Sequence, residues 1–224
     1  MKNIKSSKLV SLAMLSAFSF LVMLIKTPPI FPAPFNFLMY EAKDVVIVIG
    51  GFLYGPLSAM AVALVVALTE WFSGVSTTGI WGALMNFLSS CTFACTAALV
   101  YKNWRKLPGA AVGLIGGIAV TVPVMLLWNY LIVPIYTGAP RDFIAASLVP
   151  VFLPFNLIKY GLSAAITMLL YKPIRIALDK SKLLPVAATE GGKSSLKVNF
   201  GVIAVSLFII ITSVLLILSY QEII

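Results

Sequence analysis

The sequence predicts an all-α, polytopic membrane protein, and three observations carry this prediction. Of the 224 residues, 61% are hydrophobic, and the mean hydropathy of +1.05 lies far above that of soluble globular domains. Long apolar segments are each sufficient to cross a hydrocarbon core of about 30 Å; they cover roughly residues 79–101, 109–133, 147–172 and 199–220. The net charge of +9 in such a chain is first an indication of topology, so we expect lipid and no nucleic acid as a partner.

The N-terminal segment predicts a first transmembrane helix. It has a basic start followed by an apolar run of about 17 residues that ends at Lys26, as in a signal peptide. No small-x-small cleavage pattern stands at the end of this run, so we expect the helix to be retained.

Residues 44–73 are long for one membrane crossing and short for two. The pairs Gly50-Gly51 and Gly55-Pro56 predict a break near residues 54–56. With this break and a cytoplasmic N-terminus, twelve Lys and Arg residues lie inside and four lie outside or in the membrane. An unbroken segment with an external N-terminus puts eleven of these residues inside and four outside, with Lys159 left uncounted, so the charge bias alone does not decide between the two arrangements. We favour the break, because the flipped arrangement exports three lysines.

Three regions follow from this organisation. Residues 1–176 are expected to form a six-helix membrane domain, 177–198 a cytoplasmic linker, and 199–224 an additional transmembrane segment whose C-terminus lies outside. The linker contains GGKSS, but a phosphate-binding loop requires glycine at the position of Ala187 and a preceding strand. We therefore expect no ATPase in this chain, and active transport would need a separate one.

The loop after the first helix, KTPPIFPAPFNFLMYEAKD, combines four prolines with Phe31, Phe35, Phe37 and Tyr40. Prolines stiffen the loop, and the rings give it apolar surface to bury. The loop is predicted to be a lid or pocket wall at the outer mouth, or else to pack on the membrane surface.

Charged residues close this loop at the predicted start of the second helix. Glu41, Lys43 and Asp44 stand there, where carboxylates suit a helix N-terminus. Helix capping and ligand contact therefore both remain open for Glu41 and Asp44.

Two amides and one ammonium occur in otherwise apolar helices. Asn129 lies between Trp128 and Tyr130, where an aromatic belt explains the rings but not the amide. Asn156 and Lys159, in PFNLIK, are three residues apart and share one helix face.

Lys159 is the only charge that the sequence places clearly deep in a core segment. A buried intramembrane lysine predicts a functional contact. The alternatives are snorkelling, or an ion pair with Glu41, Asp44 or Asp142.

The candidate residues include no base, nucleophile or metal set, and the chain has no histidine. Cys91 and Cys95, four apart on one helix, are expected to be reduced packing residues. We therefore predict a binding pocket and not an enzyme, with no metal and no cofactor of its own. Amides and an ammonium suit a flat ligand with donors and acceptors on one edge.

A stripe of small residues marks the first helix. Ala13 and Ala17 form A-x-x-x-A, which lets a second helix approach closely. Internal packing and docking to a separate membrane subunit are both open.

Several of these motifs occur together in a known family. The order of AxxxA, PAPFNFLMYEAKD, GGFLYGP, GALMNFL, WNY, and PFNLIK followed by LLYK resembles the riboflavin-type substrate-binding (S) components of energy-coupling factor (ECF) transporters. The resemblance covers about residues 5–176. It implies a multi-pass protein of the bacterial plasma membrane that captures a vitamin outside the cell. Such a protein works with a transmembrane coupling (T) subunit and two cytoplasmic ABC-type ATPases.

The resemblance also implies a ligand and roles for single residues. The ligand would be riboflavin. The ring contacts would fall on Asn129, Asn156 and Lys159, beside Trp128, and Asn86 would be a weaker candidate for the same pocket. The loop segment Phe37, Leu38, Tyr40 and Glu41 would close the pocket, and Ala13 and Ala17 would dock the T subunit.

The segment 199–224 departs from the family pattern, and so do Glu41 and Lys43 in a variable loop. Another vitamin or a flavin derivative such as FMN therefore stays open as the ligand. A stand-alone secondary transporter also stays open, although no inverted repeat is evident.

Overall fold

The computed structural model describes residues 4–76, 78–180 and 200–221, and within these ranges the chain is helical, with an isolated bridge between Lys26 and Glu41 but no strand. The helices are α1 (Ile4–Met23), α2 (Lys43–Tyr54), α3 (Pro56–Phe72), α4 (Gly79–Asn103), α5 (Leu107–Thr137), α6 (Arg141–Ser147), the π-helical turn η1 (Leu148–Phe152), α7 (Leu153–Lys180) and α9 (Phe200–Tyr220). The predicted all-α fold is confirmed.

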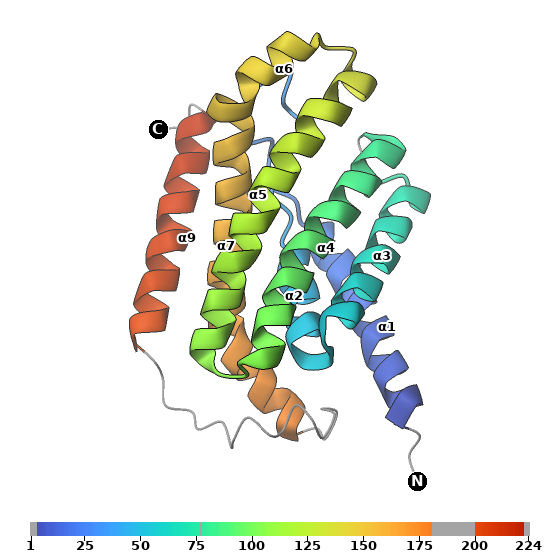
Figure 1. Cartoon of the computed structure of the whole chain (residues 1–224), viewed down its shortest axis with the longest axis vertical. Helices are drawn as coiled ribbons and strands as arrows, with labels where there is room; N and C mark the ends of the chain where they lie inside the picture. The colour runs from blue at the N-terminus through green and yellow to red at the C-terminus, as the bar shows by residue number, and fades with distance from the viewer. Residues whose placement is uncertain (1–3, 77, 181–199, 222–224) are drawn as a thin grey trace.

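Length and composition identify which helices can cross a membrane. Four stretches are long and apolar enough among the described residues, namely α4, α5, the continuous stretch Arg141–Ile174, and α9. Shorter apolar helices cover Lys8–Met23 and Pro56–Phe72. The helices lie side by side, with α1 at one edge of the bundle and α9 at the other (Figure 1).

The predicted break in residues 44–73 is confirmed. Gly55 ends α2 in a left-handed region with φ of 91°, and Pro56 begins α3. A residue with a side chain rarely adopts that φ, and proline fits the first helical turn because its missing N–H is not needed there. The 12-residue α2 is therefore a short helix, and its residues from Lys43 to Leu53 are all buried.

The predicted segment 147–172 begins with an irregular turn. Pro150 lies in η1, and Pro154 lies in the first turn of α7. Proline lacks an N–H and pushes against the preceding turn, which is the usual cause of such a local deformation. α7 then continues to Lys180, past the domain boundary predicted at residue 176, and the greater part of the predicted linker falls outside the described residues.

A close seam joins α4 and α5 in the core. A Cβ on Gly113 would lie 2.6 Å from the carbonyl oxygen of Ala97, and one on Gly117 would lie 2.9 Å from the Phe93 ring. Because backbone cannot move aside as a flexible side chain can, the two helices approach each other only where glycine is present.

This seam gives the first prediction. Gly113→Ala is expected to destabilise the fold by about 1–3 kcal/mol, because the added methyl group overpacks the seam. Gly116→Ala on the same helix is the matched control, since a Cβ there meets no atom within 4 Å and alanine favours the helix. Thermal unfolding in detergent measures both. Equal midpoints for the two variants would contradict the tight seam.

Candidate binding site

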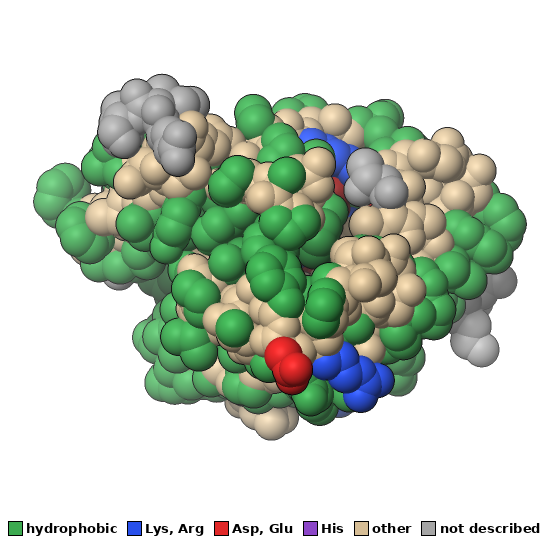
Figure 2. Space-filling model, turned by 90° about the horizontal axis from the view of Figure 1, so that it is seen from above, with side chains coloured by type: hydrophobic (Ala, Val, Ile, Leu, Met, Phe, Trp, Pro, Cys, Tyr) green, Lys and Arg blue, Asp and Glu red, His purple; other side chains and the backbone are tan. Residues whose placement is uncertain are grey.

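A cavity opens between the loop after α1 and helices α3, α4, α5 and α7. Its free volume is about 50 Å³, below the range of about 300–1,000 Å³ typical of small-molecule sites, so its walls lie close together. The end of the bundle that carries α6 is covered mainly by hydrophobic and uncharged groups, with charged side chains in two small patches (Figure 2). The cavity walls carry both polar and apolar side chains.

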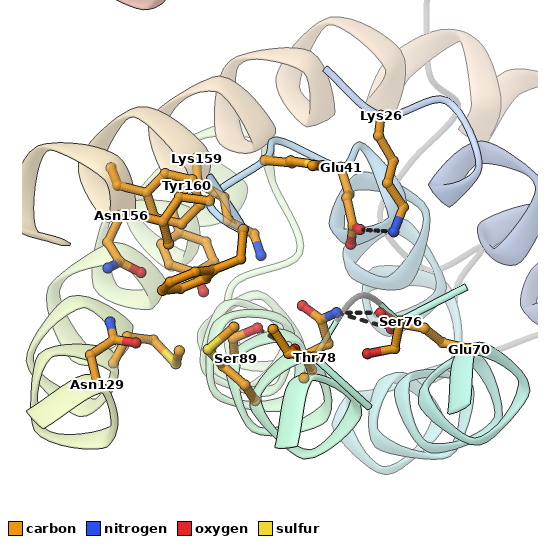
Figure 3. Close-up of a pocket in the computed structure, with 18 residues that line it drawn as sticks. Lys26, Glu41, Glu70, Ser76, Thr78, Ser89, Asn129, Asn156, Lys159 and Tyr160 are labelled. Carbon is orange, nitrogen blue, oxygen red and sulfur yellow. Dashed lines mark hydrogen bonds and ion pairs between the residues drawn. The ribbon is translucent and has the colours of Figure 1, made fainter. Parts of the chain in front are cut away.

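One end of the cavity carries the predicted amides. Asn129 on α5 and Asn156 on α7 lie at the same side of the cavity, with Lys159 and Tyr160 beside Asn156 (Figure 3). Asn129 and Asn156 are 2% and 1% exposed. The Asn156 amide donates to the Phe152 carbonyl oxygen at 2.7 Å, whereas Oδ1 of Asn129 is buried with no hydrogen-bond partner in the described chain. We call Asn129, Asn156 and Lys159 the amide end.

Lys159 is buried but its donors are not used up. Its Nζ lies 3.8 Å from Oδ2 of Asp44, which is close enough for charge attraction and too long for a hydrogen bond. Asp44 accepts a short hydrogen bond from Ser90 instead. The pair with Asp44, one of the predicted alternatives, is therefore present, while Asp142 is exposed on α6. Lys159 also lines the cavity, so the ion pair and a ligand contact are compatible.

The opposite end is ionic. Nζ of Lys43 lies 2.6 Å from Oε2 of Glu41 and 3.1 Å from Oε2 of Glu70. Lys26 pairs with the other oxygen of Glu41 at 2.9 Å, and the Asn86 amide donates to both oxygens of Glu70 at 2.8 and 2.9 Å. We call this set the ionic end; Figure 3 shows Lys26 with Glu41 and Glu70 on the side away from the amides.

The charge state of Glu41 follows from its neighbours. Glu41 lies before α2, outside the helices. Burial by itself raises the pKa of its carboxyl group, but the ammonium groups of Lys43, Lys159 and Lys26 outweigh burial and lower this pKa to about 2. Glu41 is therefore ionised at every physiological pH.

Two expectations about charge need correction. Lys159 is not the only charge deep in the bundle, because Glu70, Lys43 and Asp44 are at most 2% exposed. Glu70 was missed although a carboxylate inside an apolar run is itself a signal. No side chain caps α2 by a hydrogen bond, since Ala42 is the N-cap, although Asp44 lies in the first turn, where a carboxylate suits the helix N-terminus. The carboxylates pair across helices instead.

The structure brings most of the predicted site residues together. Phe37, Leu38, Glu41, Asn86, Asn129, Asn156 and Lys159 all line the cavity. Tyr40 and Trp128 do not: Tyr40 is buried with its hydroxyl 3.5 Å from Ser163, and Trp128 packs partly buried against the core. Sequence reasoning also missed smaller polar groups of the wall; these are Ser76, Thr78 and Ser89. Single serines and threonines give no signal in a sequence.

The loop forms a wall of the cavity. Phe37, Leu38 and Met39 line the space, and the Phe35 ring packs against Phe143 and Phe152 with centroids 5.7 and 5.4 Å apart. The predicted lid or pocket wall is therefore present, and its apolar face is buried.

Ala13 and Ala17 lie away from the cavity. Both are exposed on α1 and line an apolar groove against α3, together with Leu9, Ala61 and Val65. The small residues of α1 thus leave a shallow surface that is open on the outside of the bundle.

The ionic end gives a second prediction. Lys43→Met is expected to lower stability by about 3–5 kcal/mol, because it leaves Glu41 and Glu70 buried without the ammonium between them. Lys26→Met is the matched control, since Lys26 contacts Glu41 alone and its side chain is 19% exposed. Thermal unfolding of both variants in detergent checks this. A Lys43 variant as stable as the Lys26 variant would mean that the pairing contributes little.

Comparison with known proteins agrees with this architecture. Residues 7–171 match the family model described as the substrate-specific component of ECF transporters. The Riboflavin transporter FmnP of Bacillus subtilis (strain 168) is 32% identical over 69% of this chain and 85% of its own length. The Riboflavin transporter RibU of Staphylococcus aureus (strain TCH60) is 30% identical over 75% of this chain and 90% of its own.

A solved structure gives the same result for the fold. The S component of a bacterial ECF transporter superposes with a TM-score of 0.67 at 29% identity, over 78% of this chain and 98% of that one. Together with the apolar helices, these matches describe a membrane protein. The chain belongs to the family of substrate-specific components of ECF transporters.

Proposed function

We propose that this chain is the high-affinity riboflavin-binding subunit of an ATP-driven ECF importer. It captures riboflavin at the outer side, with its N-terminus in the cytoplasm, and delivers the vitamin inward with a T subunit and two ATPases. Two relatives that carry the name riboflavin transporter support the choice of ligand. The single observation that carries the proposal is the amide end of the cavity.

The amide end offers unused hydrogen-bonding groups to a ligand. Asn129 has a buried carbonyl oxygen without a partner, which is costly unless a bound donor satisfies it. Its amide group presents an acceptor and a donor side by side, as does the imide edge of a flavin ring. Lys159 supplies an ammonium for a ring carbonyl oxygen. Phe155 and Tyr160 line the same part of the cavity and give the flat ring apolar contact.

The charge balance of the site favours an uncharged ligand. Three ammonium groups, of Lys26, Lys43 and Lys159, face three carboxylates, of Glu41, Asp44 and Glu70, and all of them are paired. A phosphate group entering this site would add negative charge to a set of groups whose charges already sum to zero. The balance therefore favours riboflavin over its phosphate, FMN.

Coupling to transport is assigned to α1. Ala13 and Ala17 line an exposed apolar groove, and small residues let a helix of a second membrane protein pack closely. This groove lies on α1 and α3, and none of its lining residues belongs to the ligand cavity. Binding and coupling are thereby separated on the molecule.

Titration of the purified protein tests the ligand. Riboflavin is added in detergent with flavin fluorescence as the readout, and FMN is then offered as a competitor. Saturable quenching by riboflavin, with weaker competition by FMN, is expected. Binding of a different vitamin with no response to flavins would overturn the ligand assignment, and uptake by vesicles without ATP or partner subunits would overturn the importer.

Lys159→Ala is expected to weaken riboflavin binding by about 1.5–3 kcal/mol, the usual worth of a hydrogen bond to a charged group. The fluorescence titration measures the change. Because Lys159 also faces Asp44, the thermal midpoint is recorded alongside, and Lys102→Ala, at an exposed lysine outside the cavity, serves as the control. An unchanged affinity in a folded Lys159 variant would assign Lys159 to structure alone.

Replacing Ala13 and Ala17 by leucine is expected to leave riboflavin binding intact and to abolish coupled uptake, because bulk fills the groove. Binding is measured by titration and uptake in cells with the complete transporter. Leucine at the exposed Met14 of the same helix is the control. Loss of binding in the double variant would contradict a docking role and indicate internal packing.

A further inference from the structure

Helix α9 has no place in the function described so far. The family match ends at residue 171, and α9 covers Phe200–Tyr220 beyond it. None of its residues lines the ligand cavity. Most of its large side chains, such as Phe208 at 68%, are exposed, while its inner face packs along α7. The helix therefore adds something other than a ligand contact.

The last turn of α9 contacts the loop between α1 and α2, residues 24–42. Nε2 of Gln221 donates a hydrogen bond of 2.9 Å to the Pro29 carbonyl oxygen. The rings of Tyr220 and Phe31 lie 4.5 Å apart between centroids. Ile217, 8% exposed, belongs to the same buried cluster as Phe31. Hydrogen-bonding, aromatic and aliphatic contacts thus converge on one short stretch of the loop.

That stretch is connected to the cavity wall within the loop. The Ile30 amide donates to the Leu38 carbonyl oxygen at 2.9 Å, and the Leu38 amide donates to the Phe35 carbonyl oxygen at 3.0 Å. Leu38 itself lines the cavity. A displacement of residues 29–31 would therefore also displace Leu38, which lines the cavity.

We propose that α9 is a strap that holds the loop closed over the cavity and slows the passage of ligand. The strap contacts the loop, and none of its residues lines the cavity. Its contribution to the closed state is therefore the same with and without ligand. Removing it makes opening more frequent, so association and release accelerate together while the dissociation constant stays nearly the same. The kinetic part of this inference rests on the proposed riboflavin function.

The test uses the full-length chain with Tyr220→Ala and Gln221→Ala combined. Leu216→Ala is the matched control, because Leu216 is on the same helix, is 48% exposed and is absent from the contacts with the loop. Gln221→Ala alone removes the hydrogen bond without touching the rings, and it serves if the double variant does not fold.

The first measurement is hydrogen exchange of the ligand-free protein in detergent, on peptides that contain the Ile30 and Leu38 amides. About tenfold faster exchange is expected in the double variant, the effect of one lost hydrogen bond and one lost ring pair, and none in the control. Exchange equal to that of the wild type would overturn the strap. This measurement involves no riboflavin, so it judges the strap even if the proposed ligand is wrong.

The second measurement is stopped-flow flavin fluorescence. The association and dissociation rate constants are both expected to rise about five- to tenfold, with a dissociation constant within about twofold of the wild type. Faster release with an unchanged association rate would mean that α9 increases the affinity for the ligand, and it would contradict the proposal that α9 slows both association and release. A wild-type protein that does not bind riboflavin would overturn the proposed function. The hydrogen-exchange result would then decide by itself whether α9 holds the loop.

Discussion

The architecture of the half of the bundle that contains the cavity depends on one buried ammonium group, that of Lys43. It lies between Glu41 from the loop and Glu70 from α3, while the Lys43 carbonyl oxygen accepts a hydrogen bond from Ser19 of α1 at 3.2 Å. One residue thereby joins four parts of the chain. Desolvation makes a buried ion pair a poor source of net stability, but an ammonium left without its carboxylates is so costly that alternative packings are excluded. The main effect of Lys43 is therefore to fix the positions of the loop, α1, α2 and α3 relative to one another.

This constraint divides the cavity into a satisfied end and an unsatisfied end. At the ionic end, Glu70 accepts hydrogen bonds from both Lys43 and Asn86, so little capacity remains for a ligand. At the amide end, Asn129 keeps a free carbonyl oxygen, and the Lys159 ammonium is 3.8 Å from its counter-ion. Recognition is strongest where a ligand meets groups that the protein has left unpaired. The ionic end thus holds the wall in place, and under the proposed function the amide end contacts the ligand.

Local signals in the sequence predicted the features that depend on neighbours along the chain. Gly55 before Pro56 set the break between α2 and α3, and the spacing of Asn156 and Lys159 placed both on one wall of the cavity. The Lys159–Asp44 pair was among the predicted alternatives, but the pairings of Glu70 were missed, because Glu70 meets a lysine 27 residues earlier and an amide 16 residues later. Tyr40 and Trp128 lie outside the cavity lining for a related reason: an aromatic ring near a pocket can equally well pack in the core, and the sequence does not distinguish the two positions.

The position of α9 is compatible with both proposed roles of the bundle. It lies against α7, whereas the groove with Ala13 and Ala17 lies at the opposite edge, on α1 and α3 (Figure 1). An added helix on the α1 side would cover the groove and block a coupling subunit. On the α7 side it leaves the groove open, and its last turn reaches the loop that walls the cavity. The extra helix thus acts where the loop is held and leaves the docking face free, so that retention of ligand and coupling can vary independently.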